Sequence, residues 1–274
     1  MAARKPLAGR VIAVPEAREL ERLSAMLEQK GATTLRYPLV SLLDAPDSAA
    51  VEAWLMELVR GELDDLIVMT GEGFTRLMSF ANRLGLQDRA VSALARMRTV
   101  TRGPKASRAL RDIGLLPSLT PDSPTTDGVI DLLREVDLEG RTLGLQLFGQ
   151  EPNHRLVKFL TRAGARVRAV VPYIYARGID DDRAVDLIRR LADGSIDSIA
   201  FTCGAQVDRL FAVAATNGAD ELLRAGLERT RIAAVGPVTA ASLRRRGFRV
   251  SVVPRNSFFM RSLVDEVVAA LRTA

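Results

Sequence analysis

The chain repeats its own sequence markers at an interval of roughly 133 residues, and this duplication limits the fold more than any other feature. The stretch Leu7 to Arg10 recurs, 131 residues on, as Leu138 to Arg141, and each copy precedes a short apolar segment. Further pairs lie 132 to 134 residues apart: Gly31 and Gly164, Pro38 and Pro172, Thr70 and Thr202, Gly103 and Gly236, Pro121 and Pro254. We therefore interpret the 274 residues as two copies of one unit.

Within each copy, short apolar stretches alternate with stretches of helical spacing. Val11–Val14 is typical of a buried strand, and Leu20, Leu23 and Leu27 then recur at the interval of a helix face. Strands are predicted at 11–14, 34–40, 66–69, 98–101, 116–120, 143–147, 167–171, 196–202, 232–235 and 250–253, and helices at 16–30, 75–84, 106–113 and 126–135. Five strand–helix modules per copy predict an α/β fold with two flavodoxin-like, doubly wound parallel sheets.

Matched prolines indicate where the chain crosses from one domain to the other. Pro38 and Pro172 follow equivalent predicted strands, where a proline favours an extended connection over a central strand. If the chain crosses at both points, one lobe comprises residues 1–38 and 173–274, and the other comprises residues 39–172. Two extended crossings would form a two-stranded hinge, with a cleft between the lobes.

The charge is basic and carried almost entirely by arginine. Lys and Arg number 39 against 33 Asp and Glu, which gives a net charge of +6, and only 4 of the basic residues are lysines. One interpretation is a solvated surface; the other is an arginine-rich cleft for a multiply anionic ligand, because guanidinium groups bind carboxylates in bidentate fashion. Basic runs interleaved with aromatic residues and DNA-reading motifs are absent, so we expect no nucleic-acid partner.

Single cysteine and histidine residues exclude several classes of site. With Cys203 alone the chain cannot form an intramolecular disulfide, and with His154 alone it lacks the ligands of a zinc site, so we expect no metal. A buried or turn cysteine is favoured over a nucleophile, and a surface or capping histidine over an acid–base group. Neither a membrane span nor a signal-peptide core of about 7–15 apolar residues is present, and we expect a cytoplasmic protein.

Small and hydroxyl residues follow the predicted strands at the edge where parallel α/β sheets bind ligands. At this edge helix N-termini direct backbone N–H groups toward an anion. The candidate binding residues are Thr70, Gly71, Thr101, Arg102, Ser107, Thr126, Thr202, Cys203, Gly236, Pro237 and Thr239. The alternative interpretation is that they are helix caps and tight turns. A dinucleotide fingerprint beginning at Gly71 and Gly73 fails because its third glycine position is Arg76.

Taken in order, several of these segments resemble one known family. The turn Gly236–Ala240, the strand Ile199–Thr202 and the turn Thr125–Gly128 are similar to uroporphyrinogen-III synthase, and with the duplication the resemblance covers essentially the whole chain. It implies two lobes, a hinge, and an active site without a cofactor. The implied reaction closes linear hydroxymethylbilane with inversion of its last ring and loss of water.

The resemblance also assigns roles to residues. Tyr175 matches the tyrosine on the hinge side that helps the hydroxyl leave, and Tyr173, on the same face of an extended strand, could serve instead. Thr239 and Thr202 match two threonines of the family's turns. The serine usual after the strand-end threonine is replaced by Gly71 in one copy and Cys203 in the other.

The segments Thr101–Lys105 and Gln146–Gly149 look more like a divergent branch of the family, in which the lobes are often fused to a winged-helix domain. No such domain is expected up to Ala274. Two hypotheses stay open: a cyclising lyase of tetrapyrrole synthesis, and a non-catalytic protein that senses a tetrapyrrole or small anion. Both predict a monomer that binds an anionic ligand. The first also raises the question of transient contact with the deaminase that supplies the bilane.

Overall fold

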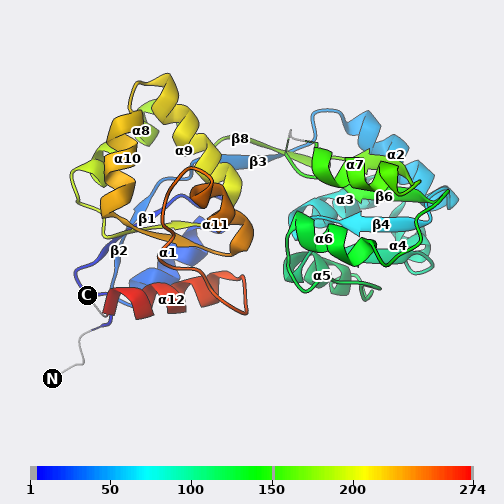
Figure 1. Cartoon of the computed structure of the whole chain (residues 1–274), viewed down its shortest axis with the longest axis horizontal. Coiled ribbons are helices and arrows are strands. Elements are labelled where there is room, and N and C mark those ends of the chain that lie inside the picture. The colour runs from blue at the N-terminus through cyan, green and yellow to red at the C-terminus, as the bar shows by residue number, and fades with distance from the viewer. Residues whose placement is uncertain (1–4, 150–151, 273–274) are drawn as a thin grey trace. The chain divides into compact units, whose positions relative to one another are not determined.

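The computed structural model describes residues 5–149 and 152–272 and divides the chain into two compact units (Figure 1). Unit 1 comprises Met1–Ser41 and Ala176–Ala274, and unit 2 comprises Leu42–Tyr175. The two crossings run through β3 (Val40–Asp44) and β8 (Tyr173–Arg177), which pair in a two-stranded sheet. The crossings expected after residues 38 and 172 lie just before these two strands.

Unit 1 contains a parallel sheet in the order β10-β9-β1-β2. Its strands are β1 (Val11–Val14), β2 (Thr33–Arg36), β9 (Ser198–Phe201) and β10 (Arg231–Ala234). The first two come from the first sequence copy and the last two from the second, so this sheet is assembled from both copies.

Unit 2 has a parallel sheet of the same construction, in the order β5-β4-β6-β7. Its strands are β4 (Asp65–Val68), β5 (Arg98–Thr101), β6 (Thr142–Gln146) and β7 (Arg166–Val170). Each strand occupies the place that its duplicate holds in unit 1. The predicted α/β fold with two parallel sheets is confirmed, and the strand order is that of a flavodoxin-like half.

The fifth strand predicted in each copy is wrong. Segment 116–120 contributes only the single bridge Val100↔Leu119, and segment 250–253 only Ala233↔Val252. Prolines explain the short pairing, because Pro117, Pro121 and Pro254 have no N–H to extend the ladder.

Helices cover both faces of each sheet. Unit 1 carries α1 (Leu20–Gln29), α8 (Asp181–Ala192), α9 (Gly204–Thr216), α10 (Asp220–Arg229), α11 (Pro237–Arg244) and α12 (Met260–Arg272). Unit 2 carries α2 (Ser48–Arg60), α3 (Gly71–Arg83), α4 (Gln87–Leu94), α5 (Pro104–Arg111), α6 (Thr126–Leu133) and α7 (His154–Arg162). Alternation along β4 shows the two layers: Leu66 and Val68 enter one core, and Ile67 and Met69 enter the other.

Some element limits differ from those predicted. The strand predicted at 34–40 is two strands, because the ladder of β2 ends before Pro38 and β3 begins at Val40. The helix predicted from residue 75 begins at Gly71, since the Thr70 hydroxyl accepts the Gly73 N–H at 3.0 Å and caps it.

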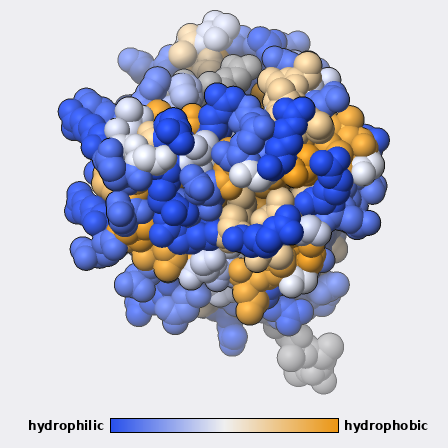
Figure 2. Space-filling model, turned by 90° about the vertical axis from the view of Figure 1, so that its right-hand side faces the viewer, coloured by the Kyte–Doolittle hydropathy of each residue, from blue (hydrophilic) through white to orange (hydrophobic). Residues whose placement is uncertain are grey.

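The surface of unit 2 that faces the viewer in Figure 2 is mostly hydrophilic, with apolar atoms in separate patches between charged side chains. None of the helices in the described residues is long and apolar enough to cross a membrane. The described residues also contain no cluster of three or more His, Cys, Asp or Glu side chains that could hold a metal ion.

Candidate functional site

Both units direct helix N-termini toward the carboxyl edge of their sheet (Figure 1). In unit 2, α3 follows β4 and α5 follows β5; in unit 1, α9 follows β9 and α11 follows β10. The candidate binding residues other than Thr126 lie in or just after these turns. The N-caps of α3 and α9 are Thr70 and Cys203, so Thr70 corresponds to Cys203 and not, as the sequence markers indicated, to Thr202.

Thr70 and Gly71 hold the first turn of unit 2 together. The Thr70 N–H donates to Gln146 Oε1 at 3.0 Å, which ties this turn to the end of β6. A Cβ on Gly71 would lie 2.9 Å from the carbonyl carbon of Lys105, so only glycine allows α3 and α5 to approach this closely. Both residues serve the packing of the edge as well as any ligand.

Thr101 and Ser107 direct their hydroxyls inward. Both are buried, and their Oγ atoms lie 2.7 Å apart, while Thr101 Oγ1 also lies 3.0 Å from Thr120 Oγ1. These hydroxyls therefore satisfy one another, and what this turn offers a ligand is its backbone and Arg102.

Arg102 is half-buried directly after β5. Its guanidinium carbon lies 5.1 Å from the centre of the Phe148 ring, and its backbone N–H donates to Val68 O. Burial lowers the pKa of Arg102, and the nearby Tyr173 and Tyr175 act in the opposite direction. In the described part of the chain its guanidinium has no carboxylate partner.

The two tyrosines of β8 form a pair at the edge of unit 2. Their rings meet edge to face, with centres 5.5 Å apart, and their hydroxyl oxygens are 3.5 Å apart. Tyr173 is almost fully buried, whereas Tyr175 is half-buried and lies against Gly149, at 3.7 Å from where its Cβ would be. The pair thus has a buried member and an accessible one.

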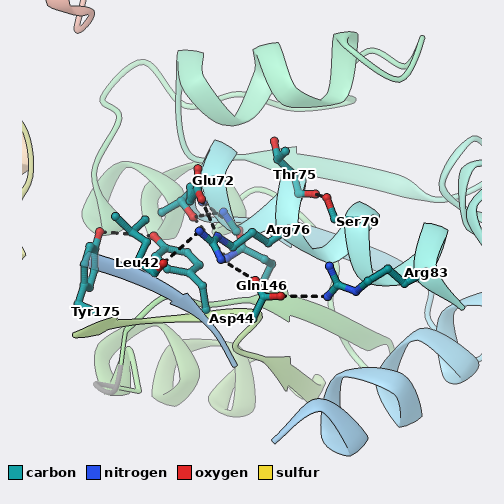
Figure 3. A network of polar contacts seen from close by, with 12 residues as sticks. Leu42, Asp44, Glu72, Thr75, Arg76, Ser79, Arg83, Gln146 and Tyr175 are labelled. Atoms are coloured by element: carbon teal, nitrogen blue, oxygen red, sulfur yellow. Dashed lines mark hydrogen bonds and ion pairs between the residues drawn. The ribbon is translucent and has the colours of Figure 1, made fainter. Parts of the chain in front are cut away.

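Arg76, which the sequence did not single out as a site residue, connects this pair to α3 (Figure 3). It bonds to Glu72 at 2.6 Å and to Asp44 at 2.5 Å, and its guanidinium carbon lies 5.9 Å from the Tyr173 ring centre. Arg83 shares Asp44 at 3.1 Å. The four-residue spacing of Glu72 and Arg76 on one helix was the available signal.

Thr126 lies at the start of α6 and joins it to α7. Its Oγ1 accepts from Asn153 Nδ2 at 3.0 Å, and the preceding Thr125 caps α6 through the Gly128 N–H. His154, the first residue of α7, is exposed. This turn contributes helix N-termini to the edge.

In unit 1 the strand-end residues surround a buried carboxylate. The Thr202 hydroxyl donates to Glu16, and Gln206 Nε2 donates to the same carboxylate at 3.2 Å. The oxygen of the Gln206 amide accepts the N–H groups of Thr202 at 2.9 Å and Cys203 at 3.4 Å. The polar groups of this turn are thus largely satisfied within unit 1, by a carboxylate that the sequence analysis did not single out.

Gly236, Pro237 and Thr239 form the start of α11. Pro237 occupies the first turn, where its missing N–H leaves no bond unmade, and Thr239 is buried. A Cβ on Gly236 would lie 3.1 Å from the Phe258 ring, so the glycine allows the chain to pass this ring closely.

Comparisons with known proteins agree on one family. The family model described as uroporphyrinogen-III synthase HemD matches residues 21–271. The Bacillus subtilis protein YjjA, which is uncharacterized, is 31% identical over 251 residues, covering 91% of this chain and 92% of its own.

Solved structures show the same fold. A mutant uroporphyrinogen III synthase from the extremely thermophilic bacterium Thermus thermophilus is 28% identical, with a TM-score of 0.77 over 97% of this chain and 100% of that one. The synthetase from Helicobacter pylori, at 13% identity and a TM-score of 0.53 over 95% and 99% of the two chains, shows likeness of fold alone. The chain is therefore a member of the uroporphyrinogen-III synthase family.

Proposed function

We propose that the protein is a uroporphyrinogen-III synthase, which cyclises linear hydroxymethylbilane with inversion of its last pyrrole ring and loss of water. The observation that carries the proposal is the tyrosine pair of β8, with Tyr175 accessible and the Arg102 cation nearby. In this proposal the protein acts as a monomer without a cofactor, on a bilane supplied by a deaminase.

Water loss needs a proton donor and little else from the protein. The C–O bond of the hydroxymethyl group breaks as the pyrrole nitrogen supplies electron density, and the phenol of Tyr175 gives its proton to the departing hydroxide, forming water. The phenolate regains a proton when the cyclised ring loses one. A positioned donor contributes about 10²–10⁴-fold, and the orientation of the two chain ends contributes more.

Helix N-termini and arginines suit the carboxylates of such a substrate. Acetate and propionate groups on each ring can accept hydrogen bonds from backbone N–H groups at helix starts within one unit, such as those of α3 and α5 in unit 2, where the helix dipole favours an anion. The net charge of +6 acts in the same direction.

The deciding experiment supplies the purified chain with enzymatically generated hydroxymethylbilane and separates the type III isomer from the spontaneous type I isomer. Type III product supports the proposal, and only type I product, from a folded protein, contradicts it. We expect Tyr175→Phe to lower kcat about 10²-fold and Tyr173→Phe to lower it less, because the buried hydroxyl reaches substrate only through its neighbour.

Three further variants separate binding from chemistry. Thr239→Ala should mainly raise KM, and Cys203→Ser should be nearly silent. Thr202→Ala should raise KM and also lower the melting temperature, because the Thr202 hydroxyl donates to the buried Glu16 carboxylate. An inactive Cys203→Ser protein beside a fully active Tyr173→Phe/Tyr175→Phe double variant would replace this mechanism with thiol chemistry.

A second candidate function, a non-catalytic tetrapyrrole sensor, has its own supporting observation. Gly71 and Cys203 stand where the family usually has a serine after the strand-end threonine, so each copy lacks a hydroxyl that the family's pattern supplies. A protein that binds a tetrapyrrole tightly yet forms no type III isomer would favour this candidate.

A further inference from the structure

Arg102 differs from every other partly buried arginine of unit 2. In the described residues of that unit, the partly buried arginines are Arg76, Arg98, Arg102 and Arg141. Arg76 pairs with Asp44 and Glu72, and both Arg98 and Arg141 pair with Asp65. Arg102 has no such partner within the described residues, although it is sheltered from solvent.

An unpaired cation taken partly out of water is unfavourable for folding. The Phe148 ring offsets part of this cost through a cation–π contact, but a ring does not use the guanidinium N–H groups. The guanidinium N–H groups form a planar fork, and this geometry matches a carboxylate that accepts two hydrogen bonds.

A carboxylate bound by Arg102 would lie next to the tyrosine pair. Phe148, which stacks on Arg102, is followed in the chain by Gly149, and Gly149 lies against the Tyr175 ring. The turn after β6 therefore contacts both the cation and the accessible phenol.

We propose that Arg102, stacked on Phe148, binds one ring carboxylate of the tetrapyrrole and thereby holds that ring against Tyr175. This inference rests on the proposed function for its ligand but assigns a separate task to Arg102. Arg102 holds a carboxylate, while Tyr175 acts on the hydroxyl. A ring with a methyl group in place of the carboxylate would leave the guanidinium unpaired and would be rejected.

The test measures binding of uroporphyrin III, a stable octacarboxylate, by the quenching of its fluorescence. We expect Arg102→Gln to weaken binding about 10- to 100-fold, since charged hydrogen bonds are lost. Arg102→Lys, which keeps the charge but not the planar fork, should weaken it about 5-fold. Arg111→Gln removes the same charge from the exposed end of α5 and should leave binding unchanged.

The melting temperature gives a second readout that a structural arginine would not reproduce. Because Arg102 has no acidic partner among the described residues, Arg102→Gln should raise the melting temperature while it weakens binding; an arginine that holds the fold together would lower both. Phe148→Leu should weaken binding without removing any charge.

The outcomes separate this inference from the proposed function. Unchanged binding in Arg102→Gln, a lowered melting temperature, or no binding of the porphyrin by the wild-type protein would overturn the inference. Arg102-dependent binding by a protein that forms no type III isomer would support the inference and contradict the synthase. Type III formation that is unaffected by Arg102→Gln would do the reverse.

Discussion

In both units a glutamine side chain accepts the backbone N–H of a helix N-cap, but the glutamine lies on a strand in unit 2 and on a helix in unit 1. In unit 2 the side chain of Gln146, at the end of β6, accepts the N–H of the N-cap Thr70. In unit 1 the side chain of Gln206, in the first turn of α9, accepts the N–H of the N-cap Cys203. The strand register places Pro15 where unit 2 has Gln146.

The exchange extends to the residue that faces each glutamine. Gly73 occupies the helix position that corresponds to Gln206, and a Cβ there would lie 2.5 Å from the amide carbon of Gln146. The helix therefore carries glycine where the strand supplies the amide, and supplies the amide itself where the strand has proline. Duplicated backbones thus preserve an acceptor for the N-cap N–H, not the residue that provides it.

The carboxyl edges of the two sheets also differ in the charge of the side chains beside them, and this difference is larger than the exchange of the glutamines. Unit 1 buries the Glu16 carboxylate beside its turn, whereas unit 2 shelters the Arg102 cation. An anionic ligand gains charged hydrogen bonds at the edge of unit 2 and meets a carboxylate at that of unit 1. The two units therefore differ in the charge at this edge while sharing one fold.

The largest expected effect tests whether the units fold as separate bodies. Residues 39–172 expressed alone should give a compact domain with cooperative unfolding by circular dichroism, because they contain one complete sheet. A chain cut between residues 132 and 138 severs unit 2, so neither half should fold alone. Sequence halves that fold alone, together with a 39–172 fragment that does not fold, would show that the two units are not the folding bodies of this chain.

Asp65 and Ser198 occupy equivalent positions, as the first residues of β4 and β9, at the amino edge of each sheet. Asp65 is buried and bonds Arg98 at 2.7 Å and Arg141 at 2.6 Å, whereas the Ser198 hydroxyl donates to Arg231 O at 2.8 Å. Asp65→Ala should lower the free energy of unfolding by about 1.5–3 kcal/mol, because charged hydrogen bonds to two partly exposed arginines are lost. Ser198→Ala should cost about 1 kcal/mol. Urea titration measures both free energies of unfolding, and equal losses would show that Asp65 stabilises unit 2 no more than Ser198 stabilises unit 1.

Exchanging the glutamines tests the opening comparison directly. Gly73→Ala should destabilise the protein by about 1–3 kcal/mol, since the new methyl group clashes with Gln146 and Thr70. Gly73→Gln combined with Gln146→Ala copies the arrangement of unit 1, and should be more stable than Gly73→Gln alone. If the double variant is the less stable of the two, the units do not use interchangeable acceptors.

The smallest effect concerns the tyrosine of unit 1. Burial and the hydrogen bond to Asp186 raise the pKa of Tyr37 to about 12, so its stabilising effect is present below pH 10 and is lost as the pH rises through 12. The Tyr173→Phe/Tyr175→Phe variant retains only this one of the three tyrosines, and its absorbance at alkaline pH reports Tyr37 directly. Titration near pH 10 would show that the bond to Asp186 is absent.

Periodicity and duplication by themselves determined the class of fold. Val11–Val14 and Arg98–Thr101 were predicted at the limits that the structure shows. The first is an uninterrupted apolar run, and the second is a single arginine followed by three β-branched residues. The offset markers also indicated equivalent strands in the two copies. The family resemblance, which rested on turns such as Gly236–Ala240, is confirmed by the family model.

Tertiary structure decided which side chains of the candidate turns remain available to a ligand. The sequence predicts Thr101 and Ser107 as binding residues, yet their hydroxyls bond to each other. The turn between them brings the two hydroxyls together, and no local sequence pattern predicts the geometry of that turn. Glu16 and Gln206 are distant in the chain and meet only through the pairing of β1 with β9. Arg102 acquires its character in the same way: sequence shows an arginine, whereas packing determines that it is sheltered and stacked on Phe148.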